Sequence, residues 1–283
     1  MVTQTKSKPY VLPGNPVISL PVPVVGHLVY DGRGEPVYRK LNERFRGIEG
    51  IEDTHEYKPG EPISFSNIPR QIGRAQLLRL ENDSEITVLD PIQMVQYWDL
   101  LLEKPTTYDD SSTVSVFPNE GPNETLRKRV LALLGKDKTE IPLLVVGLDI
   151  EPDDDTGFTF IETPWLKAIE APFLTKNQIV KYDPEKDTLI PSDDNTGVQI
   201  YVPSGQSGLR RAYRGGDDSL YFRYDSLLSS KGTGRVPVIQ DPKGRAENLD
   251  NLVNWLEKEQ DKLRKAQSRI ADALKHLRAN KIS

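Results

Sequence analysis

The sequence predicts an α+β protein with a mixed N-terminal domain, a β-rich second domain and a long C-terminal amphipathic helix. Three observations lead to this prediction: helical apolar spacing before residue 140, short alternating segments after it, and a heptad pattern at the end of the 283-residue chain. The predicted organisation is an extended proline-rich arm over 1–30, a mixed α+β domain over 31–140, a β-rich domain over 141–245 and a heptad helix over 246–283.

Composition excludes several classes of site. The formal net charge of -5 argues against a general binder of nucleic acid or anionic membranes, which usually carries a basic excess. The chain has no cysteine, so disulfides, thiolate metal sites and cysteine nucleophiles are excluded. Nucleic acid remains an unfavoured partner, and no membrane partner is expected.

The N-terminal arm is predicted to be extended, because prolines recur among apolar residues over its length: Pro9, Pro13, Pro16, Pro21 and Pro23. Its apolar side chains need a surface, either on the same chain or on a neighbouring subunit. The prolines at 21 and 23 interrupt the apolar stretch, so it resembles neither a signal peptide nor a membrane span. We therefore expect no secretory export and a cytoplasmic or particle-associated protein.

The elements predicted in the mixed domain are a short helix over 37–45, a hairpin of strands 74–80 and 85–89, and two further helices. The first of these helices begins at Pro91 after an Asp90 cap and buries Ile92, Val95, Trp98, Leu101 and Leu102. The second runs from Pro122 to Gly135, with Leu126 and Val130 inward and the basic residues 127–129 outward. Both helices have local start signals.

The second domain is predicted to be mainly β, with one short helix over 164–171. Its expected strands are bounded by Gly, Pro, Asp or Ser and lie at 143–148, 157–161, 178–182, 198–202, 220–224 and 235–240. Strand 157–161 is expected to pair with 143–148 across the acidic turn 151–155. A linker at 241–246 then precedes the terminal helix.

No motif predicts catalysis, a cofactor or a metal. Asp149, Glu151 and Asp153 alternate as hard-cation ligands could, but Asp154 and Phe160 stand where a calcium loop needs glycine and glutamate. A solvated acidic turn is the favoured interpretation. The three histidines, His27, His55 and His276, lack metal-site spacing, and the glycine-rich and serine-rich segments fit neither phosphate loops nor a nucleophile elbow. We therefore predict no enzyme activity.

One segment, residues 201–235, has the composition of a binding surface. Tyr and Arg provide large contact areas and planar donors, while Ser and Gly allow close contacts. The predicted binding residues are Arg210, Arg211, Tyr213, Arg214, Tyr221, Arg223 and Tyr224. Nearby Asp217, Asp218 and Asp225 offset the positive charge. An ordinary hairpin, a protein or glycan contact and nucleic-acid stacking all remain open interpretations.

The terminal helix carries a seam that predicts assembly. Its core positions are Leu249, Leu252, Leu256, Leu263, Ala266, Ile270, Ala273 and Leu277, with Glu259 at one further position. Such a helix could fold back on its own domain, or pair with another helix as a coiled coil. The alanines and Glu259 favour a close-packed or mixed contact over a leucine-rich dimer.

The function expected from these features is that of a structural or assembly subunit of a larger complex. It would contact copies of itself or other subunits through the arm and the helix. Virion and phage particle subunits share this arrangement, which is an analogy of architecture only. The alternatives are a module that presents the Arg/Tyr surface to nucleic acid or glycan, and a carboxylate-dependent enzyme using residues such as Asp149 and Asp153.

Overall fold

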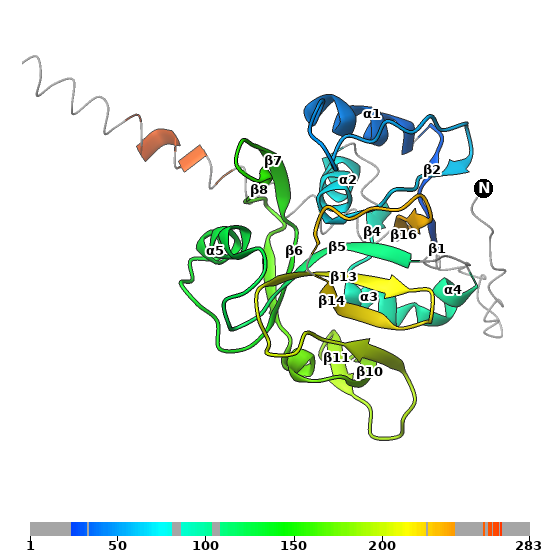
Figure 1. Cartoon of the computed structure of the whole chain (residues 1–283), viewed down its shortest axis with the longest axis vertical. Coiled ribbons are helices and arrows are strands. Elements are labelled where there is room, and N and C mark those ends of the chain that lie inside the picture. The colour runs from blue at the N-terminus through cyan, green and yellow to red at the C-terminus, as the bar shows by residue number, and fades with distance from the viewer. Residues whose placement is uncertain are drawn as a thin grey trace, which may run out of the picture.

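The structure is a computed structural model, which describes residues 24–32, 34–80, 86–103, 108–224, 226–240, 257, 260, 261, 263–265 and 267. Within these residues β-structure predominates (Figure 1). The elements before residue 103 are β1 (Val24–His27), β2 (Val29–Tyr30), α1 (Gly34–Arg44), β3 (Glu61–Pro62), α2 (Ile68–Leu80), β4 (Ile86–Val88), α3 (Pro91–Gln96) and α4 (Trp98–Leu102).

The middle of the chain adds one long strand, a helix and a series of short strands. These elements are β5 (Tyr108–Val116), α5 (Glu124–Leu133), β6 (Leu143–Val146), β7 (Asp149–Asp153), β8 (Gly157–Ile161), β9 (Lys167–Glu170) and the 3-10 helix η1 (Pro172–Thr175). The last described strands are β10 (Gln178–Asp183), β11 (Thr188–Pro191), β12 (Val198–Tyr201), β13 (Leu209–Gly215), β14 (Leu220–Tyr224), β15 (Gly234–Arg235) and β16 (Pro237–Gln240).

The main sheet curls through eight strands in the order β11-β10-β12-β14-β13-β5-β6-β9. Its neighbours are antiparallel except β12 and β14, and β15 adds a short parallel pairing with β5. The central strand β5 lies between β13 and β6, so the sheet draws strands from both sides of residue 140. A smaller sheet, β1-β16-β4, joins the start of the described chain to its later part.

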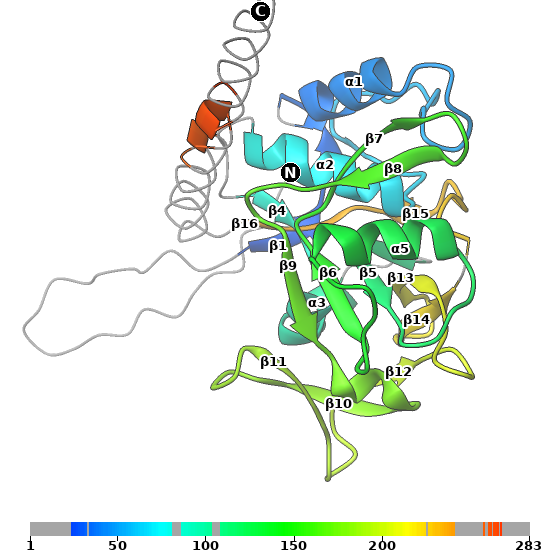
Figure 2. The same cartoon turned by 90° about the vertical axis from the view of Figure 1, so that its left-hand side faces the viewer.

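Each face of the curled sheet supports a separate apolar core. Alternation along β6 assigns Leu144 to one core and Leu143 and Val145 to the other, because successive side chains of a strand point to opposite faces. The first core packs under α3 and α4, and the second packs under α2, α5 and the β7–β8 hairpin. Figure 2 shows α5 and α3 on opposite sides of the strands.

The predicted fold class is therefore wrong: the described chain is a β-rich protein built on one curled sheet with short helices. Within the described residues there is no long C-terminal helix. Of residues 246–283 only isolated positions are described, and those that are described are helical. Among the described residues, no helix is long and apolar enough to cross a membrane.

The predicted hairpin at 74–89 is wrong in its first half, because residues 68–80 form the helix α2. Ile68, Ile72 and Ala75 follow helical spacing and are buried, but Arg74 and Gln76 on its other sides are buried as well. A helix enclosed on most sides lacks the polar stripe that identifies an amphipathic helix. Only the second strand, β4, agrees with the prediction.

Two other predictions fail between residues 143 and 171. Residues 167–170 form the edge strand β9 rather than a helix, and β8 pairs with β7 rather than with β6. Gly147 separates β6 from β7: its φ is +75°, and a Cβ there would lie 1.9 Å from the Trp165 carbonyl oxygen. This glycine redirects the chain so that β7 leaves the main sheet.

The local helix signals are confirmed. The Asp90 carboxylate accepts from the Gln93 amide at 2.8 Å, and Gln93 Oε1 accepts from the Asp90 amide at 3.1 Å, which forms a capping box. The helix is interrupted at Tyr97, which separates α3 from α4, and Leu102 is exposed rather than buried. In α5, Leu126 and Val130 are buried as expected, but Arg127 is buried too.

Candidate functional site

The Arg/Tyr segment forms the neighbouring strands β13 and β14, and its arginines and tyrosines separate into two environments. Arg210, Arg211 and Arg214 are buried, with exposed fractions of 8%, 3% and 2%. Tyr213 and Tyr221 are partly exposed, and Arg223 is exposed. Tyr224 ends β14, and its side chain lies outside the described residues. Three of the four arginines predicted to bind are therefore interior.

Arg211 makes a buried ion pair with Asp110 of β5. Its Nε donates to Asp110 Oδ1 at 2.9 Å, its Nη2 contacts the same oxygen, and its Nη1 donates to the Ser229 carbonyl at 2.9 Å. Ser66 Oγ donates to the second Asp110 oxygen at 2.9 Å. Burial still dominates over these partners and raises the pKa of Asp110 above its usual value. The pair fixes β13 against β5.

Arg214 pairs with the preceding residue of β5, Asp109, through Nε at 3.0 Å from Oδ2. His27 of β1 lies 3.1 Å from Asp109 Oδ1, so this carboxylate joins the main sheet to the smaller one. Because Asp109 and Asp110 are consecutive in a strand, their ion pairs lie on opposite faces of the sheet. The central strand is therefore held to β13 on both faces by buried charge.

Four tyrosines form a row across four adjacent strands: Tyr201 of β12, Tyr221 of β14, Tyr213 of β13 and Tyr108 of β5. The first three rings are stacked, with centroids 5.0 and 5.2 Å apart and interplanar angles of 16° and 15°. Tyr108 meets Tyr213 edge to face at 6.3 Å. We call these four residues the tyrosine row.

Two arginines cover the tyrosine row. The guanidinium carbon of Arg223 lies 4.9 Å from the Tyr221 ring centroid and 5.1 Å from that of Tyr201. Arg211 lies 5.0 Å from Tyr213 and 5.6 Å from Tyr108, so the buried ion pair anchors one end of the row. These are distances at which a cation attracts an aromatic face.

The hydroxyl edge of the row is polar. The Tyr221 hydroxyl donates to Asp217. Burial, and next this carboxylate, raise the pKa of Tyr221 to about 12. The neighbouring strand residues Leu220 and Phe222 belong to the first core, so Tyr221 and Arg223 lie on the opposite face. The result is a partly exposed strip of stacked rings, hydroxyls and one guanidinium.

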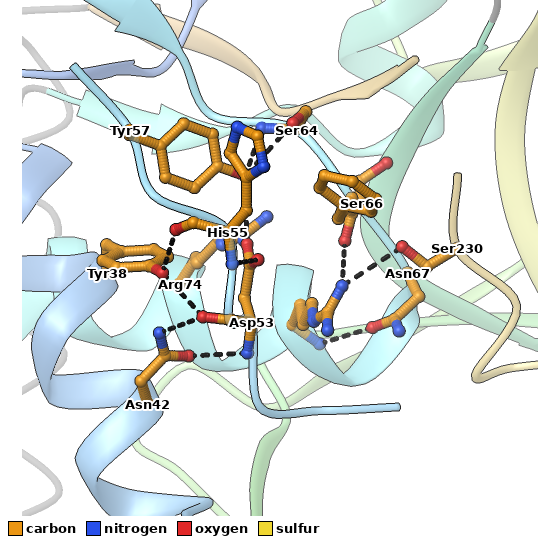
Figure 3. A network of polar contacts seen from close by, with 12 residues as sticks. Tyr38, Asn42, Asp53, His55, Tyr57, Ser64, Ser66, Asn67, Arg74 and Ser230 are labelled. Atoms are coloured by element: carbon orange, nitrogen blue, oxygen red, sulfur yellow. Dashed lines mark hydrogen bonds and ion pairs between the residues drawn. The ribbon is translucent and has the colours of Figure 1, made fainter. Parts of the chain in front are cut away.

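A second polar cluster surrounds Asp53, between α1, α2 and the loop that joins them (Figure 3). Tyr57 donates to its carboxylate at 3.0 Å, the His55 amide donates at 3.1 Å, and buried Arg74 lies 3.4 Å away. Tyr38 contacts the Asp53 and His55 carbonyl oxygens, and burial, reinforced by the Asp53 charge, raises its pKa to about 12. These bonds fix the loop to the two helices.

The acidic segment forms the β7–β8 hairpin. Asp149 is held by Arg44 at 3.0 Å, and Asp153 Oδ1 accepts from the Thr156 amide at 2.9 Å. Hydrogen bonds from Thr156 lower the pKa of Asp153 below its usual value. Within the described part of the chain, no group of three His, Asp or Glu side chains is arranged to hold a metal ion.

The predicted assembly helix falls mainly outside the described residues. Leu249, Leu252, Leu256, Ala266, Ile270, Ala273 and Leu277 all lie outside them. Leu263 is described, lies in helical backbone and is 64% exposed. The prediction that this seam mediates assembly stays a prediction.

Sequence reasoning missed the part of the site contributed by β5: Tyr108, Asp109 and Asp110. Sequence reasoning balanced the arginines with the nearby residues Asp217, Asp218 and Asp225. In the structure, the buried partners Asp109 and Asp110 lie about one hundred residues away in the chain. The run of polar residues 109–113 argued against a central strand. The one local signal for β5 is the pair of consecutive carboxylates before an alternating apolar segment.

Comparison with known proteins gives no relative: no family model, no curated protein and no solved structure matches this chain. The geometry of the described residues is therefore the basis for a functional inference.

Proposed function

We propose that this protein is an assembly subunit that associates with copies of itself, and that the tyrosine row with Arg223 is a contact surface. The observation that carries the proposal is the partly exposed stack of Tyr201, Tyr221 and Tyr213 on a sheet face that buried ion pairs hold rigid. The heptad seam of residues 246–283 supplies a second contact in this proposal. A particle of the viral or phage kind is the architectural analogy.

The composition of the surface supports a protein partner. Tyrosine and arginine are enriched at protein interfaces because they bury large areas and still offer hydrogen bonds, and few rotamers need to be ordered. Here the rings are already ordered by stacking, and Arg223 is placed over two of them. Such a surface loses little conformational entropy when a partner covers it.

The nucleic-acid alternative receives less support from the same geometry. Bases and sugars stack on free ring faces, but Tyr221 has a stacked neighbour on each side. Three of the four arginines predicted to bind are buried, so the surface offers little of the positive charge that phosphates need. A protein partner fits the exposed ring edges, hydroxyls and single guanidinium better.

The test is the solution mass of the full-length chain, measured by sedimentation equilibrium over a range of concentrations. We expect concentration-dependent oligomers for the parent chain and a weakening of association by about tenfold or more in the Tyr221→Ala, Arg223→Ala variant. The matched control is Arg39→Ala, which removes an exposed arginine of α1 away from the row.

A parent chain that stays monomeric up to about 0.5 mM would contradict self-assembly. Association that is equally strong in the row variant and the parent would show that the row is not the contact. A further version that ends near residue 246 separates the two proposed contacts, because it keeps the row and lacks the heptad seam.

A further inference from the structure

A groove lies on the opposite side of the sheet from the tyrosine row, between the α3–α4 junction and the strands β10 and β12. Its volume is about 480 Å³, within the range of ligand pockets in proteins. The residues used below are Gln96, Tyr97, Trp98 and Asp99 on one wall, and Lys181 and Tyr182 on the other.

The walls of the groove are aromatic and its rim is polar. Tyr97 and Tyr182 are partly exposed, and Trp98 is nearly buried at 9% exposure. Tyr182 is oriented by its hydroxyl, which donates to Asp187 at 2.8 Å. Asp99 and Gln96 are exposed at the same opening. Grooves of this type bind proline-rich segments, because proline rings fit between aromatic side chains and the polyproline II backbone is already extended.

This chain contains such a segment immediately before β1. Residues 1–23 include five prolines, with Val, Ile and Leu between them and Lys6 and Lys8 near the start. Asp99 and Lys181 balance each other in charge at the groove, so the match rests on composition, with prolines and aliphatic residues facing aromatic walls.

The position where this segment joins the described chain also supports the match. Val24 begins β1, which packs against α4, and Val25 shares an apolar core with Trp98. The segment is thus tethered beside the helix whose first turn lines the groove. In polyproline II conformation 23 residues span roughly 70 Å, and a short tether gives an effective concentration in the millimolar range. The tether favours the segment of the same chain over that of a second copy.

We propose that a few residues of the proline-rich segment 1–23 dock in polyproline II conformation in the groove of their own chain. The inference does not depend on the proposed assembly through the tyrosine row. It assigns the proline-rich arm a binding site that its own sheet provides.

The test places the photo-crosslinking amino acid p-benzoylphenylalanine at position 96 of the full-length chain, where the natural glutamine is exposed. After irradiation we expect crosslinks to residues 1–23, identified by mass spectrometry, at the mass of a monomer under denaturing conditions. The same amino acid at position 128, on the exposed face of α5, is the control and should give no crosslink to this segment.

Two variant sets examine the chemistry. The Tyr97→Ala, Tyr182→Ala variant should lower the crosslink yield by about tenfold, because two aromatic contacts to the segment are lost. The Pro13→Ala, Pro16→Ala variant should lower it in the same direction and leaves the folded sheet unchanged, so it remains informative if the tyrosine variant is unfolded.

Three results would overturn the proposal. Crosslinks at the mass of a dimer would assign the groove to a second copy, and crosslinks confined to other segments would assign it to another occupant. A crosslink yield that the proline substitutions do not change would exclude polyproline recognition. A chain that is monomeric in sedimentation would contradict the assembly proposal alone, so the two inferences fail separately.

Discussion

The buried ion pairs of β5 and β13 and the tyrosine row both use arginine on neighbouring strands, but water reaches only the row. Asp110 and Arg211 are enclosed and paired, whereas Tyr221 and Arg223 lie at the surface. Burial makes each ionic partner necessary to the other, because an unpaired charge inside a protein is costly. Tyr221 and Arg223 contribute less to the free energy of folding and are therefore available for contact with a partner.

The largest effect is expected inside the sheet. Asp110→Asn should lower the free energy of unfolding by about 3–5 kcal/mol, because Arg211 would remain buried without a charged partner. Urea denaturation followed by circular dichroism measures the change. The matched control is Asp217→Asn at the surface, which should change stability by less than about 0.5 kcal/mol. Equal effects of the two substitutions would remove the distinction between the regions.

Removing the centre of the tyrosine row should have a smaller effect on folding. Tyr221→Ala loses two stacked aromatic contacts and part of a cation–π contact, so we expect a loss of about 1–3 kcal/mol in the free energy of unfolding. The same urea titration measures it. A loss as large as that of Asp110→Asn would show that the row is part of the folding core.

The pKa of Tyr221 tests the exposed edge of the row. Its folded-state value of about 12 exceeds the ordinary value of 10.0, first through burial and then through Asp217. The folded chain therefore keeps this proton between about pH 10 and 12 while the unfolded chain loses it. The resulting stabilisation is complete below pH 10 and is lost as the pH rises through 12.

The measurement is an NMR titration of ring-labelled tyrosine, with the Tyr221 signal assigned from Tyr221→Phe. In Asp217→Asn the pKa should fall part of the way toward 10, because burial remains while the neighbouring charge is removed. An unchanged pKa would mean that the Asp217 hydrogen bond does not form in solution.

The smallest folding effect is expected from Arg223→Ala. An exposed cation–π contact contributes about 0.5–1 kcal/mol, so the variant should remain close to the parent in urea. Its association should nevertheless weaken in sedimentation if the row is an interface. A variant that is destabilised by several kcal/mol, or that associates like the parent, would contradict the division between folding and contact.

Local signals in the sequence predicted several elements well. Asp90 and Pro91 predict the start of α3, because an N-cap and a first-turn proline act within one turn, and the structure adds Gln93 as the second half of a capping box. The bounds of β14 agree with those predicted from its alternation and its flanking turn residues. The Arg/Tyr segment was also identified as unusual, and its exposed part became the tyrosine row.

The predictions that failed depended on distant partners. The helix α2 was taken for a strand because tertiary contacts cover most of its sides, which removes the polar stripe that marks a surface helix. The buried position of Arg211 follows from Asp110, which is 101 residues away, and no local pattern specifies that pairing.

The sequence by itself determined where elements with local signals begin, such as α3 and β14, and that cysteine chemistry is excluded. Only the tertiary structure decided that one curled sheet joins described strands from residue 108 to residue 224, which arginines are interior and which tyrosines align. The physical reason is range: caps, turns and alternation act within a few residues, whereas strand order and charge pairing depend on contacts between segments far apart in the chain.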